Sequence, residues 1–473
     1  MYLIKNIVFA ISKEIDIKKA LSRKLRIKSI DEIRILRRSI DARKKNELKF
    51  NYTVLSELPP KYLSHPDVLE YTKPTPYVNS EKKLTDPHPF IIGAGPAGLF
   101  AALSLVEKGF QPYIFERGER IEERIIKVSE FLQKGIPDEE SNVQFGEGGA
   151  GTFSDGKLTT RSRDFYIEKV LEYFVKFGAD EKIKYEALPH LGTDGLKKIV
   201  LNIRKFLEEK GCKFFWNHKL EDISVEKDKI TSVKINSKKY QPEIVILAIG
   251  NSARDTFEML SQKTEMENKP FAVGFRIEHS QDFINEAFYG DKNDFNITGH
   301  ATYRLTAKFQ NRGIYSFCMC PGGYVIPASS ERDMLVLNGM SFQKRDNKFA
   351  NSAIVVTVNR TDFGNEILAG MKFQRMIESK CFQSDHPYFA PAQKPLDFLQ
   401  NNATKLLSKT SYKPGTISQN LNNILPADIT TALKAGLKSF QKRTPGFCEK
   451  GILLAPETRT SSPVRILRNK NTF

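Results

Sequence analysis

The glycine-rich stretch GAGPAG at residues 93–98 constrains the fold of this chain more than any other part of its sequence. An apolar pair at 91–92 precedes it, and residues 99–106 carry apolar side chains at helical spacing. A second apolar run at 110–115 leads directly to Glu116. This order predicts a strand, a tight turn, a helix and a second strand, which together open a doubly wound α/β sheet.

Each of the three glycines in this stretch is needed for a different physical reason. Gly93 permits the tight turn, Gly95 lets the backbone approach a pyrophosphate at the helix N-terminus, and Gly98 lets the helix pack closely on the strand. Glu116, at the end of the second strand, is placed to accept hydrogen bonds from a ribose. The spacing and the elements around it therefore predict a dinucleotide-binding site.

Several longer motifs resemble one group of flavoproteins. GAGPAGL, followed by an acid in FERG, is similar to the FAD-binding half of glutathione-reductase-type flavoproteins. The wider resemblance is to the uncharacterised bacterial FAD-dependent dehydrogenase family, also described as NAD(FAD)-utilising dehydrogenase-like, and it spans essentially the whole chain. The motifs that carry it are FGEGGAGTFSDGKL (145–158), PHLGTD (189–194), YSFCMCPGG (315–323), NSAIVVTV (351–358) and PETRTSSPVRI (456–466).

The resemblance implies a fold, a cofactor and a reaction class. The expected fold class is α/β, with an FAD-binding Rossmann-like three-layer ββα domain, an inserted β-rich substrate domain and a small N-terminal α+β module. The expected cofactor is FAD, and the expected activity is hydride transfer between the flavin and a small substrate that the sequence does not identify. NAD(P)H as an external donor is left open, because only one G-x-G-x-x-G is present.

The second glycine-rich stretch, FGEGGAGTFSDGKL at 145–158, is expected to complete the cofactor site. Its glycines remove Cβ atoms from a backbone that would present consecutive N–H groups to phosphate oxygens and to the polar edge of a flavin. Ser154 and Lys157 are expected to add donors, and the resemblance places Leu220 near the adenine. Gly250 either lies beside the cofactor or is an ordinary strand-ending turn residue. The predicted cofactor-binding residues are Gly93, Gly95, Pro96, Ala97, Gly98, Glu116, Arg117, Gly148, Gly149, Ala150, Gly151, Ser154, Gly156, Lys157, Leu158, Leu220 and Gly250.

The pattern of apolar residues, prolines and turns predicts five segments. The first is a ferredoxin-like α+β module, with strands at 2–11, 32–40 and 48–55 and a helix at 16–27. Helices at 418–423 and 428–440 are expected to pack back on the FAD domain. The predicted boundaries are 1–56 for the module, 57–88 for a proline-rich linker, 89–261 and 409–473 for the two parts of the FAD domain, and 262–408 for the insert.

Composition leaves an alternative open. Lys and Arg number 73 against 56 Asp and Glu, and much of this excess lies before residue 50. An FAD-fold protein that binds RNA through the strip RRSIDARKK at 37–45 is therefore the second interpretation, although no aromatic stacking platform accompanies the strip. Ordinary surface charge is the simpler explanation of the excess.

A third interpretation is a degenerate FAD-fold protein with impaired flavin binding. In the family, a further glycine-rich segment follows PETRTSSPVRI, whereas this sequence ends at Phe473. The resemblance then implies weakened FAD binding if nothing fills that place.

The remaining chemistry-bearing residues give weaker signals. Five scattered cysteines fit a reducing compartment, so a cytoplasmic protein without a membrane span is expected. Cys318 and Cys320 are two apart on a predicted strand and should face the same side, either as a redox pair or as two small buried residues. Arg459 and Arg465 either face the flavin or a substrate, or are packing and surface residues. The histidines lack metal-ligand spacing, so no metal is expected. The sequence does not identify a catalytic residue, a substrate or an oligomeric state.

Overall fold

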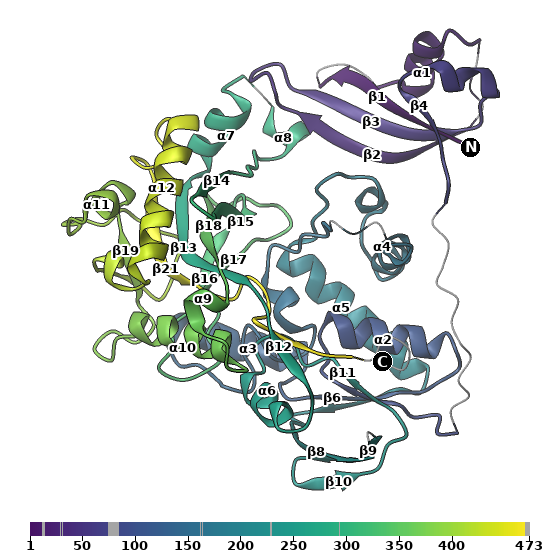
Figure 1. Cartoon of the computed structure of the whole chain (residues 1–473). Coiled ribbons are helices and arrows are strands. Elements are labelled where there is room, and N and C mark those ends of the chain that lie inside the picture. Colours follow the sequence, from purple (N-terminus) through teal and green to yellow (C-terminus); the bar gives the residue numbers. More distant parts are fainter. Residues whose placement is uncertain are drawn as a thin grey trace. The chain divides into compact units, whose positions relative to one another are not determined.

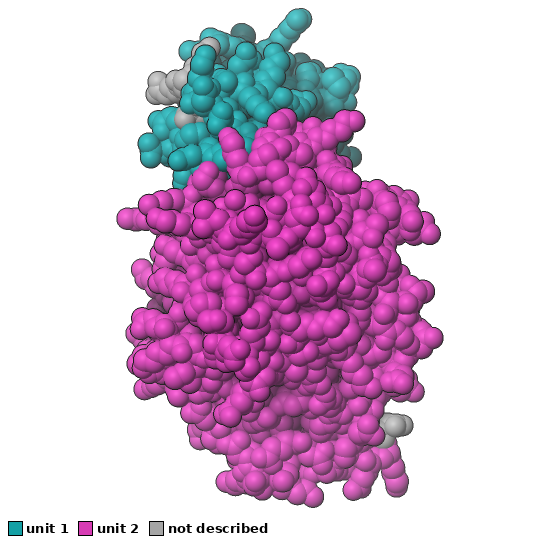
Figure 2. Space-filling view, turned by 90° about the vertical axis from the view of Figure 1, so that its left-hand side faces the viewer, with its two compact units in different colours: residues 1–82, 157–191, 282–302 teal, residues 83–156, 192–281, 303–473 magenta. Residues whose placement is uncertain are grey.

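The computed structural model describes residues 1–11, 15–28, 30, 32–73, 85–160, 162, 164–227, 229–292 and 294–468. Its contacts divide the chain into two compact units, which Figure 2 shows in different colours. The first unit comprises residues 1–82, 157–191 and 282–302, and the second comprises residues 83–156, 192–281 and 303–473.

The first unit is built on a four-stranded antiparallel sheet in the order β2-β3-β1-β4 (Figure 1). Helix α1 begins where the Asp16 side chain accepts a hydrogen bond from the Lys19 N–H, and it buries Ile17, Leu21 and Leu25. The strand order matches a split β-α-β arrangement, as the sequence predicts. The bounds are β1 (Tyr2–Ala10), α1 (Ile17–Leu25), β2 (Ile33–Asp41), β3 (Lys49–Ser56) and β4 (Val68–Glu70).

Strand β4 lies within residues 57–88, where the sequence predicts an extended linker. It pairs with β1, and the Val68 side chain is buried, so the sheet of the module continues to Glu70. The other elements of the first unit are short helical segments: η1 (Pro60–Ser64), α4 (Tyr166–Lys176), η3 (Glu181–Lys184), α7 (Gln281–Tyr289) and α8 (Phe295–Thr298).

The second unit contains a four-stranded parallel sheet in the order β11-β5-β6-β7. A three-stranded antiparallel sheet, β10-β9-β8, packs with α6 against its apolar face through a cluster that includes Phe90, Phe115, Ile223 and Leu260. Helices α2 and α5 contact β5 and β7 of the parallel sheet. These three layers confirm the predicted Rossmann-like ββα arrangement. The bounds are β5 (Phe90–Ile92), α2 (Pro96–Val106), β6 (Tyr113–Glu116), α3 (Ile121–Lys134), α5 (Gly192–Glu209), β7 (Lys213–Trp216), β8 (Leu220–Glu226), β9 (Lys229–Ile235), β10 (Lys238–Tyr240), β11 (Val245–Leu247) and α6 (Arg254–Ser261).

A seven-stranded sheet, in the order β14-β15-β18-β13-β21-β19-β20, forms the β-rich part of the second unit. The central strands β13 and β18 are buried along almost their whole length, although β13 carries Arg276, Glu278 and His279 among its apolar residues. The strand bounds are β13 (Phe271–Ser280), β14 (Thr306–Phe309), β15 (Arg312–Cys320), β18 (Phe349–Val358), β19 (Ala390–Gln393), β20 (Thr416–Ser418) and β21 (Ile452–Glu457).

Two expectations for the C-terminal part are wrong. Helix α12 (Ala427–Arg443) exists where the sequence predicts a helix, but it contacts β14, β15 and β18 of the seven-stranded sheet and does not pack on the parallel sheet. Residues 418–423 do not form one helix, because β20 ends at Ser418 and a single turn, η4 (Leu421–Asn423), follows. The remaining elements are η2 (Gly149–Phe153), the pairs β12 (Met266–Asn268) with β22 (Val464–Ile466) and β16 (Tyr324–Pro327) with β17 (Leu337–Met340), and helices α9 (Arg360–Phe363), α10 (Ala369–Cys381) and α11 (Pro395–Gln400).

Candidate functional site

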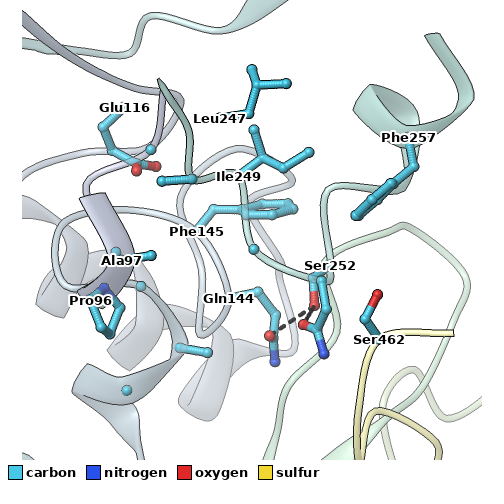
Figure 3. Close-up of a pocket in the computed structure, with 18 of the residues that line it drawn as sticks. Pro96, Ala97, Glu116, Gln144, Phe145, Leu247, Ile249, Ser252, Phe257 and Ser462 are labelled. Carbon is cyan, nitrogen blue, oxygen red and sulfur yellow. Dashed lines mark hydrogen bonds between the residues drawn. The ribbon is translucent and has the colours of Figure 1, made fainter. Parts of the chain in front are cut away.

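A cleft of about 530 Å³ opens at the end of the parallel sheet where β5 meets α2 (Figure 3). This volume falls inside the range of roughly 300–1,000 Å³ that ligand pockets occupy. The lining comes from the first glycine-rich turn, the second glycine-rich stretch, the turn after β11 and the segment around β22. The cleft therefore lies at the carboxyl ends of parallel strands, where open α/β sheets bind ligands.

The glycines of the first turn have distinct surroundings. Gly93 has φ +108°, and a Cβ atom there would lie 2.3 Å from the Ala248 carbonyl oxygen. A Cβ atom at Gly98 would lie 1.9 Å from the Gly93 carbonyl oxygen, so both positions require glycine for packing. At Gly95 the nearest atom to such a Cβ is the Gly149 Cα, 3.8 Å away. Only Gly95 is therefore free of a packing clash, and its missing side chain leaves room in the cleft.

The Glu116 carboxylate joins the two glycine-rich segments. It is 5% exposed and accepts hydrogen bonds from the N–H groups of Ala94 (2.8 Å), Gly118 (3.0 Å) and Gly146 (2.9 Å). Glu116 also lines the cleft, as expected at the end of β6. Three backbone donors thus hold this carboxylate in place, while its contact with a ribose stays a prediction.

The second glycine-rich stretch lies directly against the first. The Gly148 N–H donates to the Ala94 carbonyl oxygen (2.8 Å), and a Cβ atom on Gly149 would come within 3.1 Å of the Gly95 Cα. The expectation that its consecutive N–H groups face a ligand is wrong for Gly146, Gly148 and Gly149, since each donates to the protein. An added Cβ atom would meet the Arg124 side chain at Gly146, the Thr152 side chain at Gly148 and the Gly95 backbone at Gly149, and all three glycines have positive φ.

The structure brings together about half of the predicted cofactor-binding residues. Those that line the cleft are Gly93, Gly95, Pro96, Ala97, Glu116, Gly149, Ala150, Gly151 and Gly250. Arg117 and Leu220 line a small adjoining pocket of about 30 Å³. Within the part of the chain that the structure describes, the linings of these two pockets do not include Gly98, Gly148, Ser154, Gly156, Lys157 or Leu158.

Several of the residues that do not line either pocket make contacts with other parts of the protein instead. The Ser154 hydroxyl donates to the Gly151 carbonyl oxygen (2.7 Å), and a Cβ atom on Gly156 would meet the Gly192 N–H nitrogen at 2.9 Å. Lys157 and Leu158 belong to the first unit, where the Leu158 N–H donates to Pro189. Their role as cofactor contacts stays a prediction.

Several cleft residues were not found by the sequence analysis. Ser252 donates a hydrogen bond to the Gln144 side-chain oxygen (2.9 Å), and Ser462 reaches the same cleft from the segment before β22 (Figure 3). Phe257 lines it from α6. These residues are far apart in the chain. Two features of the sequence could have indicated them: Gln144 directly precedes the second glycine-rich stretch, and Ser462 lies in PETRTSSPVRI.

Charges beside the small pocket are paired. The Arg117 guanidinium lies 4.1 Å from the Phe145 ring centre and bonds Glu140 (2.6 Å) and Asp255 (2.9 Å). Lys219 also bonds Asp255 (2.6 Å). Burial alone would raise the pKa of Asp255, but the hydrogen bonds and charges of Arg117 and Lys219 outweigh it and hold that pKa far below its usual range.

Two arginines near the C-terminal motif are also paired. Arg459 bonds the buried Glu378 carboxylate (3.0 Å) and the Ser330 hydroxyl (2.7 Å), and Arg465 pairs with Glu267 (2.8 Å). Of the two alternatives for these arginines, the contacts favour packing and surface roles.

The two nearby cysteines do not have the geometry expected of an extended strand. Cys318 has φ +46°, and the pairing of β15 with β18 is irregular between Phe317 and Cys320. Cys318 and Cys320 therefore do not lie on a regular strand, and the expectation that their side chains share one face stays a prediction. The Cys320 thiol donates to the Cys318 carbonyl oxygen (3.3 Å).

Two arginines of the basic strip at 37–45 form ion pairs within the first unit. Arg38 forms an ion pair with Glu186, and its guanidinium lies 5.1 Å from the Phe50 ring centre. Arg43 pairs with Asp41 (2.5 Å). These contacts reduce the charge available to RNA phosphates, and RNA binding stays an untested prediction.

The described ranges hold neither a membrane-spanning helix nor a cluster of metal-ligating side chains. No helix there is both long and apolar enough to cross a bilayer. In the same ranges, no group of three or more His, Cys, Asp or Glu side chains lies close enough together to hold a metal ion.

Comparison with known proteins gives two family matches and one relative. A model described as "FAD-dependent protein, C-terminal domain-like" matches residues 270–460, and a domain of unknown function matches residues 2–56. An uncharacterised protein of Clostridium beijerinckii is 42% identical over 487 residues, which covers 98% of this chain and 91% of that protein.

Comparison with solved structures gives weaker matches. Tetracycline destructase Tet(51) has a TM-score of 0.30 and 12% identity, covering 59% of this chain and 58% of that one. CtdE in complex with FAD has a TM-score of 0.29 and 11% identity, covering 79% and 72%. The glycerol-3-phosphate dehydrogenase from Bacillus halodurans complexed with FAD has a TM-score of 0.28 and 11% identity, covering 58% and 48%. This chain thus spans less than two thirds of Tet(51) and of the Bacillus enzyme.

Proposed function

This chain belongs to a family of FAD-dependent proteins, and on that premise we propose that it is an FAD-dependent oxidoreductase that transfers hydride between a flavin and a small substrate. The observation that carries the proposal is the cleft in which α2 begins. Gly95 and Ala97 line it, the second glycine-rich stretch faces them, and only Gly95 has room for an added Cβ among the three glycines of the first turn.

The residues of the cleft fit an FAD molecule by their chemistry. The first N–H groups of a helix have no acceptor within it, so the start of α2 offers donors and a positive dipole end to a pyrophosphate. Glu116 lines both the cleft and the small pocket beside it, Arg117 lines that pocket, and an adenosine would be held there. The apolar side chains of Phe145, Leu247 and Phe257 would exclude water from a flat aromatic ligand.

FAD, when bound, supplies the hydride chemistry of its flavin ring. The protein's own part is to bind, to orient and to exclude water. Glu116 fixes the two glycine-rich segments against each other through the N–H groups of Ala94 and Gly146. Gln144 and Ser252 place polar groups in the same cleft, where they would orient a ligand by hydrogen bonds.

The proposal is tested by mixing the purified FAD-loaded chain anaerobically with NADH, with NADPH and with a panel of small reduced metabolites. We expect at least one donor to bleach the visible flavin absorbance, and oxygen or an artificial acceptor to restore it. A Gly109→Ala chain is the matched control, because Gly109 is not among the cleft residues and an added Cβ there would meet no atom within 4 Å. A flavin that stays oxidised with every donor, although dithionite reduces it, would contradict the oxidoreductase proposal.

A further inference from the structure

Arg124 occupies an unusual place for an arginine. It lies on the buried face of α3 together with Ile121, Val128 and Phe131, and its side chain is 0% exposed. Buried arginines normally have a carboxylate partner, because an unpaired charge in the protein interior is costly. The hydrogen bonds of Arg124 instead go to backbone carbonyl oxygens.

The four carbonyls all belong to the segment that leads into and forms the second glycine-rich stretch. The guanidinium donates to the carbonyl oxygens of Asn142 (2.8 Å), Val143 (3.0 Å), Glu147 (2.6 Å) and Gly149 (2.9 Å). A guanidinium has five N–H donors in a fixed plane, so this one side chain fixes the path of the whole segment.

The neighbours of Arg124 leave little space for another arrangement. A Cβ atom on Gly146 would lie 2.5 Å from the Arg124 Cδ, and the guanidinium carbon lies 4.9 Å from the Phe153 ring centre. Gly146 has φ +109°. The glycine at this position is therefore required by the arginine as well as by the backbone conformation.

The orientation of two peptide groups follows from these bonds. In a trans peptide the C=O and the next N–H point in opposite directions. Since the Glu147 and Gly149 carbonyls point at Arg124, the N–H groups of Gly148 and Ala150 point away from it. The Gly148 N–H meets the Ala94 carbonyl oxygen of the first turn (2.8 Å), and Ala150 lines the cleft.

The charge of Arg124 adds to this orientation. The charged groups that face it are the carboxylates of Glu116 and Glu147 and, across the Phe153 ring, the ammonium of Lys197. Burial lowers the pKa of Arg124 to about 10, so the guanidinium stays charged at neutral pH. Burial also raises the pKa of Glu147 to about 7, which leaves less negative charge to compensate the arginine.

We infer that Arg124 is a positioning residue for the pyrophosphate of the bound dinucleotide: it turns loop carbonyls away from the cleft and places a buried positive charge behind Gly149 and Ala150. The inference rests on the proposed function, because it assigns a residue to the binding of the same ligand. It does not place Arg124 in contact with that ligand.

The test compares Arg124→Lys and Arg124→Met in the full chain after removal of bound flavin. Lysine keeps the charge but loses the planar fork, whereas methionine loses both. Dissociation constants for ADP, which carries the pyrophosphate without the flavin, are measured by calorimetry, and unfolding midpoints without ligand are measured in parallel. Arg312→Met is the matched control, since Arg312 pairs with Asp362 and Asp428 and does not line the cleft.

We expect ADP affinity to fall about tenfold in Arg124→Lys and about a hundredfold in Arg124→Met, and to stay unchanged in Arg312→Met. Wild-type affinity in both Arg124 variants would overturn the inference, and equal losses in the two would overturn the part assigned to charge. If Arg124→Met fails to fold, the lysine variant decides by the same criterion of tenfold loss against no loss. A wild-type chain that binds neither ADP nor FAD would instead refute the proposed function itself.

Discussion

Replacing Gly95 by alanine should separate ligand binding from folding. Gly95 has φ −74° and ψ −176°, which alanine adopts without strain, and the added methyl would meet only the Gly149 Cα at 3.8 Å. Alanine reduces the conformational entropy of the unfolded chain relative to glycine, which stabilises the fold by up to about 1 kcal/mol. Alanine is also a poorer helix N-cap than glycine, which destabilises the fold by a similar amount. The free energy of unfolding should therefore change by less than about 1 kcal/mol.

The same methyl should weaken the ligand strongly, because it takes its volume from the cleft at the start of α2. Overpacking a close contact costs about 1–3 kcal/mol, which corresponds to roughly a five- to 150-fold increase in the dissociation constant. The dissociation constant for ADP or FAD is measured by calorimetry, and the free energy of unfolding by denaturant titration of the chain without ligand.

Two glycine variants provide the comparison. Gly93→Ala should destabilise the fold by more than about 3 kcal/mol, since its Cβ would lie 2.3 Å from the Ala248 carbonyl oxygen at φ +108°. Gly109→Ala, at φ +86° with no atom within 4 Å, should cost about 1 kcal/mol of stability and leave ligand affinity unchanged. If Gly95→Ala binds ADP and FAD as tightly as the wild type, the start of α2 is not the pyrophosphate site and the reasoning is refuted.

Two further predictions concern buried carboxylates. Burial raises the pKa of Glu147 from 4.5 to about 7, so between these pH values the folded wild type holds a proton that the unfolded chain has lost. The free energy of unfolding of the wild type therefore falls as pH rises through this range. Glu147→Gln should lack this loss, so its free energy of unfolding relative to the wild type should rise by at most about 3 kcal/mol between pH 5 and pH 8, as measured by denaturant titration. An advantage independent of pH would contradict the assignment. Glu378→Gln should lower the free energy of unfolding by about 3–5 kcal/mol, because it leaves the buried guanidinium groups of Arg254 and Arg459 with a weaker partner. The control Glu366→Gln, which changes an exposed ion pair, should lower it by less than about 1 kcal/mol. Equal costs in the two variants would show that the buried network does not stabilise the fold.

The sequence was informative wherever structure depends on local pattern. The strand, turn and helix around Gly93 follow from steric needs that a few neighbouring residues express, and β6 ends at Glu116 as predicted. The predicted strand at 110–115 begins only at Tyr113, because the Phe110 N–H still donates to Leu105 and closes the end of α2. Boundaries of this kind depend on the competition between a helix end and a strand start.

The sequence was less informative wherever structure depends on packing between distant segments. The stretch at 418–423 is too short for its pattern to fix a helix, and the Asn420 side chain instead caps a single turn. Gln144, Ser252 and Ser462 meet in the cleft only because separate elements pack around it. Arg124 did leave a signal, since it occupies a position on α3 where the pattern calls for an apolar residue.

The central claim, that this chain binds FAD, is tested most directly by the chain itself. The protein is purified under native conditions, its visible absorbance is recorded, and the small molecule released by heat is identified by mass spectrometry and quantified against protein. We predict FAD, at close to one molecule per chain or restored to that ratio when FAD is added to the flavin-free chain. A colourless chain that shows no binding when titrated with FAD would contradict the claim and leave the interpretation as a degenerate FAD-fold protein.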